Sequence, residues 1–291
     1  MTRTVTAGVD TSEESLAAAE WAADEAARRG LPLRLVHVWD WQPQLFGVPA
    51  TAESHQQDAD RVLRRAVERV RQARPGFEPE TVRLEGAPAE VLAREAERAE
   101  VLVLGSRGLG AIAGFLVGSV SLATLARAER PVVLVRAPGD VEAVPARGRG
   151  GDVVLGLDVA DVSEEVVTYA FEAAARQGGA LRVVHGVLPP PVLGDFSAAD
   201  DAAVRTELLS AARLTLTQVL APWREKYPGT TVGETVEVGS STRMLLDASA
   251  GASLLVVGRR IPRTALGTRI GSVTHAVLHH SPVPVAVVPH H

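Results

Sequence analysis

Residues 104–121 read LGSRGLGAIAGFLVGSVS and begin at the end of a short apolar run. That run is typical of a buried strand, and a new helix is expected to begin at Ser119. Gly105, Gly108 and Gly118 lack the side chains that would keep backbone amides away from an anion. A helix beginning at this point adds unpaired N–H groups and the positive end of its dipole. The stretch is therefore predicted to hold phosphate, and the alternative is a loop that connects strand to helix and binds nothing.

The same arrangement returns in residues 254–274, which read LLVVGRRIPRTALGTRIGSVT. An apolar run again precedes a glycine, and a Gly-Ser pair again precedes an expected helix. Gly105 and Gly118 are 13 positions apart, and so are Gly258 and Gly271. Two copies at one spacing predict that the chain contains a duplicated unit.

Other landmarks support a tandem duplication. The segment VTAGVD, which ends at Asp10, returns as VVLGLD, which ends at Asp158. We expect one domain over residues 1–138 and a second over residues 152–291. Residues 139–151 are rich in Gly, Pro and charge and are predicted to form a linker.

Strand-like and helix-like patterns alternate within each half. In the first half strands are expected at 4–10, 33–38, 81–85, 101–104 and 132–136, and helices at 12–29, 53–73, 89–99 and 119–128. Such alternation predicts βαβ units and hence a parallel sheet with helices on both faces. The expected fold class is α/β, with two domains that each contain a five-stranded parallel sheet.

Composition limits the function. The 291 residues contain no cysteine, so thiolate chemistry and disulfides are excluded. The formal net charge of −5 argues against broad binding to nucleic acid or to an anionic membrane. The N-terminal residues lack the apolar core of a signal peptide, and no apolar run is long enough to span a bilayer. A cytoplasmic location is expected.

A strand-end aspartate, a second strand containing Val-His, and the pattern GxxG, nine residues, Gly-Ser together resemble the universal stress protein family. The resemblance covers both halves and is closest to the family's ATP-binding branch. It implies two Rossmann-like domains of the adenine nucleotide alpha hydrolase type. It also implies that ATP is the ligand. A divalent cation, Mg²⁺ or Mn²⁺, is expected to accompany the triphosphate, because the site supplies few positive side chains.

The resemblance assigns expected positions to residues of the first half. Asp10 is expected at the carboxyl end of the first strand, where open α/β sheets receive ligands. His37 and Val38 are expected to border the adenine. The residues expected near the ribose and phosphates are Leu104, Gly105, Arg107, Gly108, Gly118, Ser119, Val120 and Ser121.

The second half matches less fully. Its expected nucleotide-binding residues are Asp158, His185, Val257, Gly258, Gly271, Ser272, Val273 and Thr274. Ile261 replaces the second glycine of the pattern and Pro262 follows it. A branched side chain disfavours positive φ and obstructs a close approach of backbone to phosphate. Arg259, Arg260, Arg263 and Arg269 add charge that could compensate, but the first site is expected to bind more strongly.

Several residues have a simpler structural interpretation. Asp10 and Asp158 could act only as local caps of the turns that follow them. His37 and His185 are expected to be strand residues with a structural partner rather than catalytic bases. His290 and its neighbour at the end of the sequence carry no weight in this interpretation, because terminal histidines can be native or the remnant of a tag.

The leading interpretation is an ATP-binding sensor or regulator that acts through nucleotide occupancy. The sequence has no GxSxG or HExxH motif and its glycine loops lack the GK[ST] ending of a P-loop, so weak ATP hydrolysis at most is expected. The alternatives are a slow ATPase or other nucleotide-transforming enzyme, and an interaction module with vestigial sites. The last strands of the halves, 132–136 and 283–288, are expected to pair as an intramolecular pseudo-dimer, with a homodimer as a further option.

Overall fold

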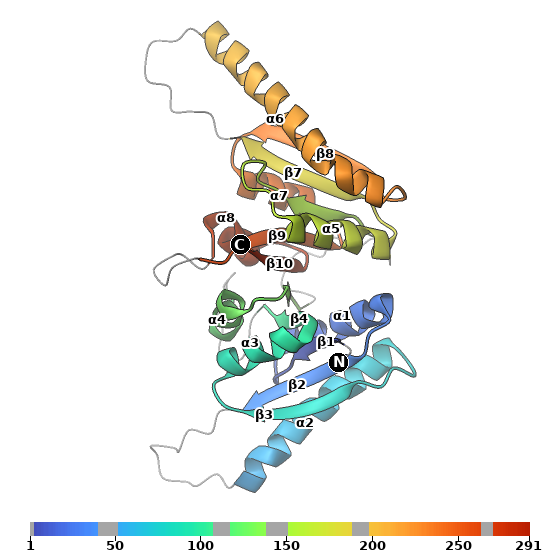
Figure 1. Cartoon of the computed structure of the whole chain (residues 1–291). Helices are drawn as coiled ribbons and strands as arrows, with labels where there is room; N and C mark the ends of the chain where they lie inside the picture. The colour runs from blue at the N-terminus through green and yellow to red at the C-terminus, as the bar shows by residue number, and fades with distance from the viewer. Residues whose placement is uncertain (1–2, 40–51, 107–116, 138–150, 188–197, 263–269) are drawn as a thin grey trace. The chain divides into compact units, whose positions relative to one another are not determined.

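The chain forms two compact units, Met1–Ala143 and Val144–His291 (Figure 1). The computed structural model describes residues 3–39, 52–106, 117–137, 151–187, 198–262 and 270–291. Nearly all of the linker expected at 139–151 lies outside these ranges. Within them, no helix combines the length and the apolar character needed to cross a bilayer.

The first unit is built around a parallel sheet with strand order β3-β2-β1-β4-β5. The strands are β1 (Thr4–Gly8), β2 (Leu33–Trp39), β3 (Glu80–Glu85), β4 (Ala99–Gly105) and β5 (Val132–Val135). The helices are α1 (Glu13–Arg29), α2 (Ala52–Ala73), α3 (Pro88–Arg98) and α4 (Ser119–Arg127).

The second unit repeats this plan with strand order β8-β7-β6-β9-β10, again parallel throughout. Its strands are β6 (Val153–Gly156), β7 (Leu181–Val187), β8 (Val232–Val238), β9 (Leu254–Arg260) and β10 (Val285–His290). Its helices are α5 (Glu164–Gln177), α6 (Ala198–Lys226), α7 (Ser241–Ser249) and α8 (Ser272–His280).

Helices cover both faces of each sheet (Figure 1). In the first unit α1 packs on α2, and α3 packs on α4; in the second, α5 packs on α6 and α7 on α8. The central strands are therefore buried on both sides, and residues such as Val5, Val103, Leu155 and Val256 have no exposed surface. These observations confirm the predicted α/β fold with two five-stranded parallel sheets.

The first helix of each unit begins and ends with the same chemistry. The hydroxyl of Ser12 accepts a hydrogen bond from the amide of Ser15 and caps α1. Gly30 ends that helix in the left-handed conformation, with φ of 64°, which glycine adopts without steric cost. Ser163 and Gly178 do the same for α5, so the duplication extends to the caps.

The two sheets differ at the carboxyl ends of two strands. In the first unit the last paired residues of β4 and β5 are Gly105 and Val135. In the second unit the pairing continues past Gly258 and Val288 and ends where Arg260 pairs with His290. Strands β9 and β10 therefore extend further, into the region where the sequence predicted a second phosphate loop.

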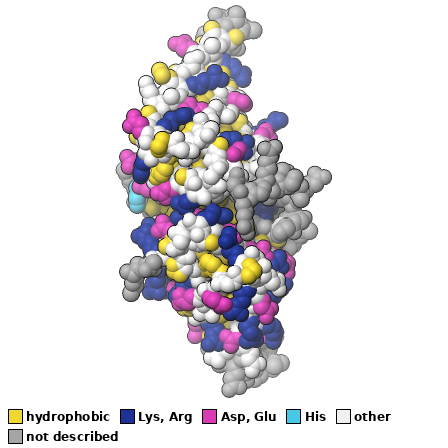
Figure 2. Space-filling model, turned by 90° about the vertical axis from the view of Figure 1, so that its right-hand side faces the viewer, with side chains coloured by type: hydrophobic (Ala, Val, Ile, Leu, Met, Phe, Trp, Pro, Cys, Tyr) yellow, Lys and Arg dark blue, Asp and Glu magenta, His cyan; other side chains and the backbone are white. Residues whose placement is uncertain are grey.

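Charged side chains of both signs are interspersed over the face of the molecule in Figure 2. Ion pairs contribute to this pattern, for example between Arg74 and Asp24 and between Arg83 and Asp60. A surface of this kind keeps local potentials small, so an anionic ligand must be recognised by groups placed close to it.

Candidate functional site

The candidate sites lie at the carboxyl ends of the central strands. In each sheet the chain first proceeds to one side of the initial strand and then returns to pair on its other side, as β4 does with β1 and β9 with β6. Ligands bind at such topological switch points in open α/β sheets. Asp10 and Gly105 occupy this position in the first unit, and Asp158 and Gly258 occupy it in the second.

The two strand-end aspartates are held differently. In the first unit Oδ1 of Asp10 accepts hydrogen bonds from both the amide (2.9 Å) and the hydroxyl (2.5 Å) of Ser12, the residue that caps α1. In the second unit Oδ1 of Asp158 accepts a hydrogen bond from the amide of Ala160, at 3.0 Å, and its side chain is exposed. Asp10 therefore holds the residue that caps α1, whereas Asp158 stabilises a short turn and lines the cavity of the second unit.

Each second strand carries a histidine with a structural partner. Nδ1 of His37 lies 2.7 Å from the carbonyl oxygen of Val9, and Nδ1 of His185 lies 3.0 Å from that of Leu157. A carbonyl oxygen only accepts, so Nδ1 carries the proton in both rings. The role expected from the sequence, a strand histidine with a local partner, agrees with this geometry. Nε2 is the nitrogen that remains to meet a ligand.

The glycines that end the fourth strands are surrounded by different groups. A Cβ atom on Gly105 would lie 2.8 Å from the carbonyl carbon of Glu14 and 2.9 Å from the amide nitrogen of Ser15, in the first turn of α1. A Cβ atom on Gly258 would lie 2.9 Å from Nε2 of His290. Both glycines thus permit close packing, in addition to any role toward phosphate.

Two of the expected nucleotide-binding residues, Ser121 and Thr274, use their hydroxyls to connect helix to strand. The hydroxyl of Ser121 donates to the carbonyl oxygen of Gly105 at 2.8 Å, and that of Thr274 donates to the carbonyl oxygen of Gly258 at 3.0 Å. Both residues are buried. Their oxygens can still accept a hydrogen bond, but their protons are used within the fold.

The helices that follow begin without a capping side chain. Gly118 and Gly271 are the N-cap residues of α4 and α8, and in the described structure neither helix has a side-chain cap or an acidic residue in its first turn. The first amides of any α-helix have no intrahelical acceptor. The amide of Gly118 itself donates to the carbonyl oxygen of Ser106 at 2.7 Å, so the amides of Ser119 onward are the ones available to an anion.

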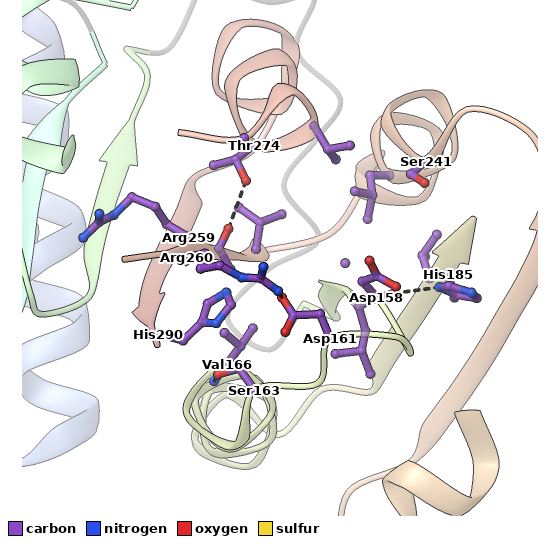
Figure 3. Close-up of a pocket in the computed structure, with 18 of the residues that line it drawn as sticks. Asp158, Asp161, Ser163, Val166, His185, Ser241, Arg259, Arg260, Thr274 and His290 are labelled. Carbon is purple, nitrogen blue, oxygen red and sulfur yellow. Dashed lines mark hydrogen bonds and ion pairs between the residues drawn. The ribbon is translucent and has the colours of Figure 1, made fainter. Parts of the chain in front are cut away.

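A cavity of about 740 Å³ opens at the carboxyl end of the second sheet (Figure 3). Seven of the residues that the sequence predicted for this half line it: Asp158, His185, Val257, Gly258, Gly271, Val273 and Thr274. The eighth, Ser272, is exposed in the first turn of α8. Among the residues that the structure describes, no three His, Asp or Glu side chains are grouped to bind a metal ion.

Charged side chains also line this cavity. Arg260 forms an ion pair with Asp161, and Figure 3 shows its side chain crossing the opening between β9 and the loop before α5. Arg259 is 4% exposed, and its side chain points away from Asp158 and His185 in Figure 3. Of the arginines expected to compensate for Ile261, Arg260 is therefore the one whose charge lies over the cavity, whereas Arg263 and Arg269 lie outside the described residues.

The expected residues of the first unit that the structure describes lie at the strand ends and the helix start that correspond to those of the second unit. Arg107 and Gly108 lie outside the described residues. Leu104 is 3% exposed and its side chain packs beside Gly8, so only its backbone can face a ligand. Val38 is half-buried on β2, and Val120 is 40% exposed at the start of α4.

Sequence reasoning missed part of the second cavity, including Asp161, Ser163, Ser241 and His290. His290 is a residue of β10, not a loose terminal histidine, and its side chain is 8% exposed. The strand-like run VPVAVV, which ends just before it, was the signal that could have identified it. Beside the cavity, a hydrogen bond from the Ser163 hydroxyl and, after it, a backbone hydrogen bond lower the pKa of Glu165, and the charge of His290 adds a smaller effect.

Comparisons with known proteins agree with this architecture. The sequence model of the universal stress protein family matches residues 1–136 and again residues 151–289. A universal stress protein of Mycobacterium tuberculosis is 36% identical over 292 residues, which cover 97% of this chain and 96% of the relative. One from Mycolicibacterium smegmatis is 32% identical, over 97% of this chain and 95% of the relative.

The fold is also shared with a solved structure. The crystal structure of a universal stress protein from Archaeoglobus fulgidus superposes with a TM-score of 0.68, covering 98% of this chain and 97% of that one at 20% identity. The chain therefore belongs to the universal stress protein family and contains the family's domain twice in tandem.

Proposed function

We propose that this protein binds adenine nucleotides at the carboxyl ends of both sheets and acts in the cytoplasm as a sensor or regulator through nucleotide occupancy. ATP with Mg²⁺ or Mn²⁺ is the proposed ligand. The observation that carries the proposal is the second-unit cavity, where Asp158, His185 and the uncapped start of α8 line one space of about 740 Å³. Ligand pockets typically measure about 300–1,000 Å³.

The groups around this cavity suit the parts of a nucleotide. Nε2 of His185 and the apolar surface of Val257 offer a hydrogen-bonding and a packing surface to a base or ribose. The amides in the first turn of α8 offer donors and a positive dipole end to phosphate. The same arrangement of strand-end aspartate, strand histidine and uncapped helix is present in the first unit.

Regulation rather than rapid turnover is the proposed role. Rapid phosphoryl transfer requires groups that stabilise charge on the transferring phosphate, such as the lysine of a P-loop. The sequence lacks the GK[ST] ending in both copies of the glycine pattern. Slow hydrolysis would not contradict the proposal, provided that nucleotide binding alone alters the response of the protein.

The proposal is tested by identifying and measuring the ligand. Purified full-length protein is denatured and the released small molecules are identified by chromatography and mass spectrometry. Calorimetric titrations with ATP, AMP and GTP follow, with and without Mg²⁺. Recovery of adenine nucleotide, or micromolar binding of ATP or AMP, supports the proposal; absence of both would indicate an interaction module with vestigial sites.

Charge variants at the two helix starts connect binding to the proposed sites. Ser119→Asp and Ser272→Asp place a carboxylate where phosphate is expected, while helix dipoles favour such a charge and the fold should be retained. Each should weaken nucleotide binding in its own half by about tenfold or more, equivalent to about 1.4 kcal/mol. Ser119→Asn and Ser272→Asn are the neutral controls. Equal binding by the Asp and Asn variants would contradict the proposed phosphate position.

The proposal includes association of the two halves. Strands β5 and β10 are the last strands in the order of their own units, and such strands expose backbone groups that favour pairing. We expect them to support an intramolecular pseudo-dimer, with a homodimer as a further option. Protease cleavage within residues 139–151 followed by size-exclusion chromatography tests this. Halves that separate after cleavage would contradict it.

A further inference from the structure

The second-unit cavity contains a buried histidine that the glycine pattern does not include. His290 is 8% exposed, lines the cavity, and has an Nδ1 atom without a hydrogen-bond partner in the described structure. The ring lies over Gly258 and between Arg260 and Val166 (Figure 3). Gly258 follows Gly105 by 153 positions, and the residue 153 positions before His290 is Ala137. The imidazole is therefore a feature of the second unit alone.

The backbone after Gly258, where the glycine pattern predicted a phosphate-binding loop, forms strand hydrogen bonds in the second unit. Because β9 and β10 continue to Arg260 and His290, the segment after Gly258 is a strand. The amide of Ile261, at the position of the pattern's second glycine, donates to the carbonyl oxygen of His290 at 2.7 Å. That amide cannot simultaneously serve an anion.

The same strand extension places positive charge at the cavity. Arg260 is the last residue of β9, its side chain is 64% exposed, and its guanidinium contacts Asp161 across the opening. Arginine binds phosphate with parallel N–H donors, and imidazole donates through a ring nitrogen. The uncapped first turn of α8 lines the same cavity.

We propose that the second unit holds the phosphate of its nucleotide with the side chains of Arg260 and His290, in place of the glycine backbone of the family pattern. Asp161 is the residue that competes with this phosphate for Arg260. This inference rests on the proposed nucleotide binding and adds the groups that recognise phosphate. Arg260 and His290 should therefore strengthen the binding of AMP and ATP, but not that of adenosine, which has no phosphate.

The experiment compares three ligands that differ only in phosphate. Full-length protein is photolabelled with 8-azido-ATP, and labelled peptides are assigned by mass spectrometry to residues 1–138 or 152–291. Unlabelled adenosine, AMP and ATP then compete for the label in each half. The difference in apparent affinity between AMP and adenosine measures phosphate recognition in the second half alone.

Two variants should remove this recognition. His290→Phe keeps an aromatic ring over Gly258 and removes both nitrogens, and Arg260→Gln removes the guanidinium charge. Each should weaken AMP and ATP in the second half by about tenfold, the effect of one charged hydrogen bond, with adenosine changed less than about twofold. Asp161→Asn should strengthen AMP and ATP by about threefold, because it releases an exposed ion-pair partner.

Matched controls lie nearby. His291→Phe changes the exposed neighbour of His290, and Arg243→Gln removes an arginine of the same unit whose side chain is 86% exposed beside Asp247. Neither should alter competition in either half. Circular dichroism and the melting temperature of each variant confirm that the second unit remains folded.

The competition pattern in the second half distinguishes phosphate recognition from a purely structural role of His290 and Arg260. Loss of AMP and ATP binding in the second half with adenosine retained supports the inference. Equal loss of all three ligands would show that His290 and Arg260 only support packing, and unchanged AMP binding would overturn the inference while leaving nucleotide binding intact. Labelling confined to the first half would also overturn it. No labelling of either half in the wild-type protein would instead refute the proposed function.

Discussion

Gly105 and Gly258 hold equivalent places in the two units, yet different parts of the chain pack against them. The backbone of Glu14, in the first turn of α1, lies against Gly105, whereas the ring of His290 and the side chain of Val166 lie against Gly258. The cause is the length of the preceding loop. The helix cap Ser12 follows Asp10 by two positions, but Ser163 follows Asp158 by five, and α5 has 14 residues where α1 has 17.

The later start of α5 has two consequences. No backbone of α5 packs against Gly258 in the way that the backbone of Glu14 packs against Gly105. The side chain of His290, at the end of the extended β10, occupies part of the space beside Gly258. The remaining space is continuous with the cavity beside Asp158. A small change in loop length therefore accompanies a different shape and chemistry of the site, although Gly258 and Gly271 keep the separation of Gly105 and Gly118.

The largest expected effect comes from adding a methyl group to each glycine. Gly105→Ala should destabilise the first unit by about 3 kcal/mol, because the new Cβ meets helix backbone that cannot move alone. Gly258→Ala should cost about 1 kcal/mol, because the ring of His290 can turn away. Urea denaturation followed by hydrogen exchange in each half measures both changes.

A double variant sharpens this first comparison. In a His290→Ala background the cost of Gly258→Ala should fall, because the ring that the Cβ would meet is gone. No single side-chain substitution should lower the cost of Gly105→Ala in this way, because the nearest atoms to its new Cβ belong to the backbone of Glu14 and Ser15. Equal costs for the two glycine substitutions would show that the different surroundings of Gly105 and Gly258 have no energetic effect.

The strand-end aspartates should show a smaller difference. Asp10→Ala removes the acceptor for both the amide and the hydroxyl of Ser12 and should destabilise the first unit by about 1–2 kcal/mol. Asp158→Ala removes one hydrogen bond of an exposed side chain and should cost about 0.5 kcal/mol. Thermal melts without nucleotide test this, and a larger loss for Asp158→Ala would contradict the assigned roles.

The fold was predictable because its signals are local and repeated. Apolar runs identified the buried strands, and the helix expected over residues 12–29 is present as α1 (Glu13–Arg29). The duplication added a second copy of each element, 148 positions later at Asp10 and Asp158 and 153 positions later at Gly105 and Gly258. The ends of β9 and β10 were less predictable, because strand pairing beyond Gly258 depends on contacts between segments distant in the sequence.

The candidate site was only partly predictable, for a related reason. Spacing identified the glycines, aspartates and helix starts, but it does not show where a side chain points. It could not show that the hydroxyl protons of Ser121 and Thr274 are used within the fold. It also gave no reason to place His290 beside Gly258, since the two approach only because β10 pairs with β9.

The hydroxyls that join helix to strand provide the next comparison. Ser121→Ala and Thr274→Val should each cost about 1 kcal/mol, because each removes a buried donor from a strand carbonyl. Ser119→Ala, at an exposed position, should change stability by less than about 0.5 kcal/mol. Similar losses of stability for Ser121→Ala and Thr274→Val would show that the hydrogen bond between helix and strand does not depend on which groups pack against Gly105 and Gly258. Denaturant midpoints with unchanged slopes provide the measurement.

The smallest expected effect is a pH dependence confined to the second unit. The hydroxyl of Ser163 donates to Glu165 and is the largest cause that holds the pKa of this carboxyl below its usual value. A backbone hydrogen bond of Glu165 is the next cause, and the charges of His290 and His291 add smaller effects. A lowered pKa in the folded state means that ionised Glu165 stabilises the fold above its unfolded pKa of about 4.3. This contribution disappears as the pH falls through the folded pKa.

Because the side chain of Glu165 is exposed, its contribution to stability should be about 0.3 kcal/mol. Glu165→Gln should therefore be less stable than wild type at pH 7, and the difference should disappear as the pH falls through the folded pKa of Glu165. In a Ser163→Ala background this pH dependence should become smaller, because the largest cause of the lowered pKa is removed. A pH dependence that persisted undiminished there would show that the Ser163 hydroxyl is not its main source.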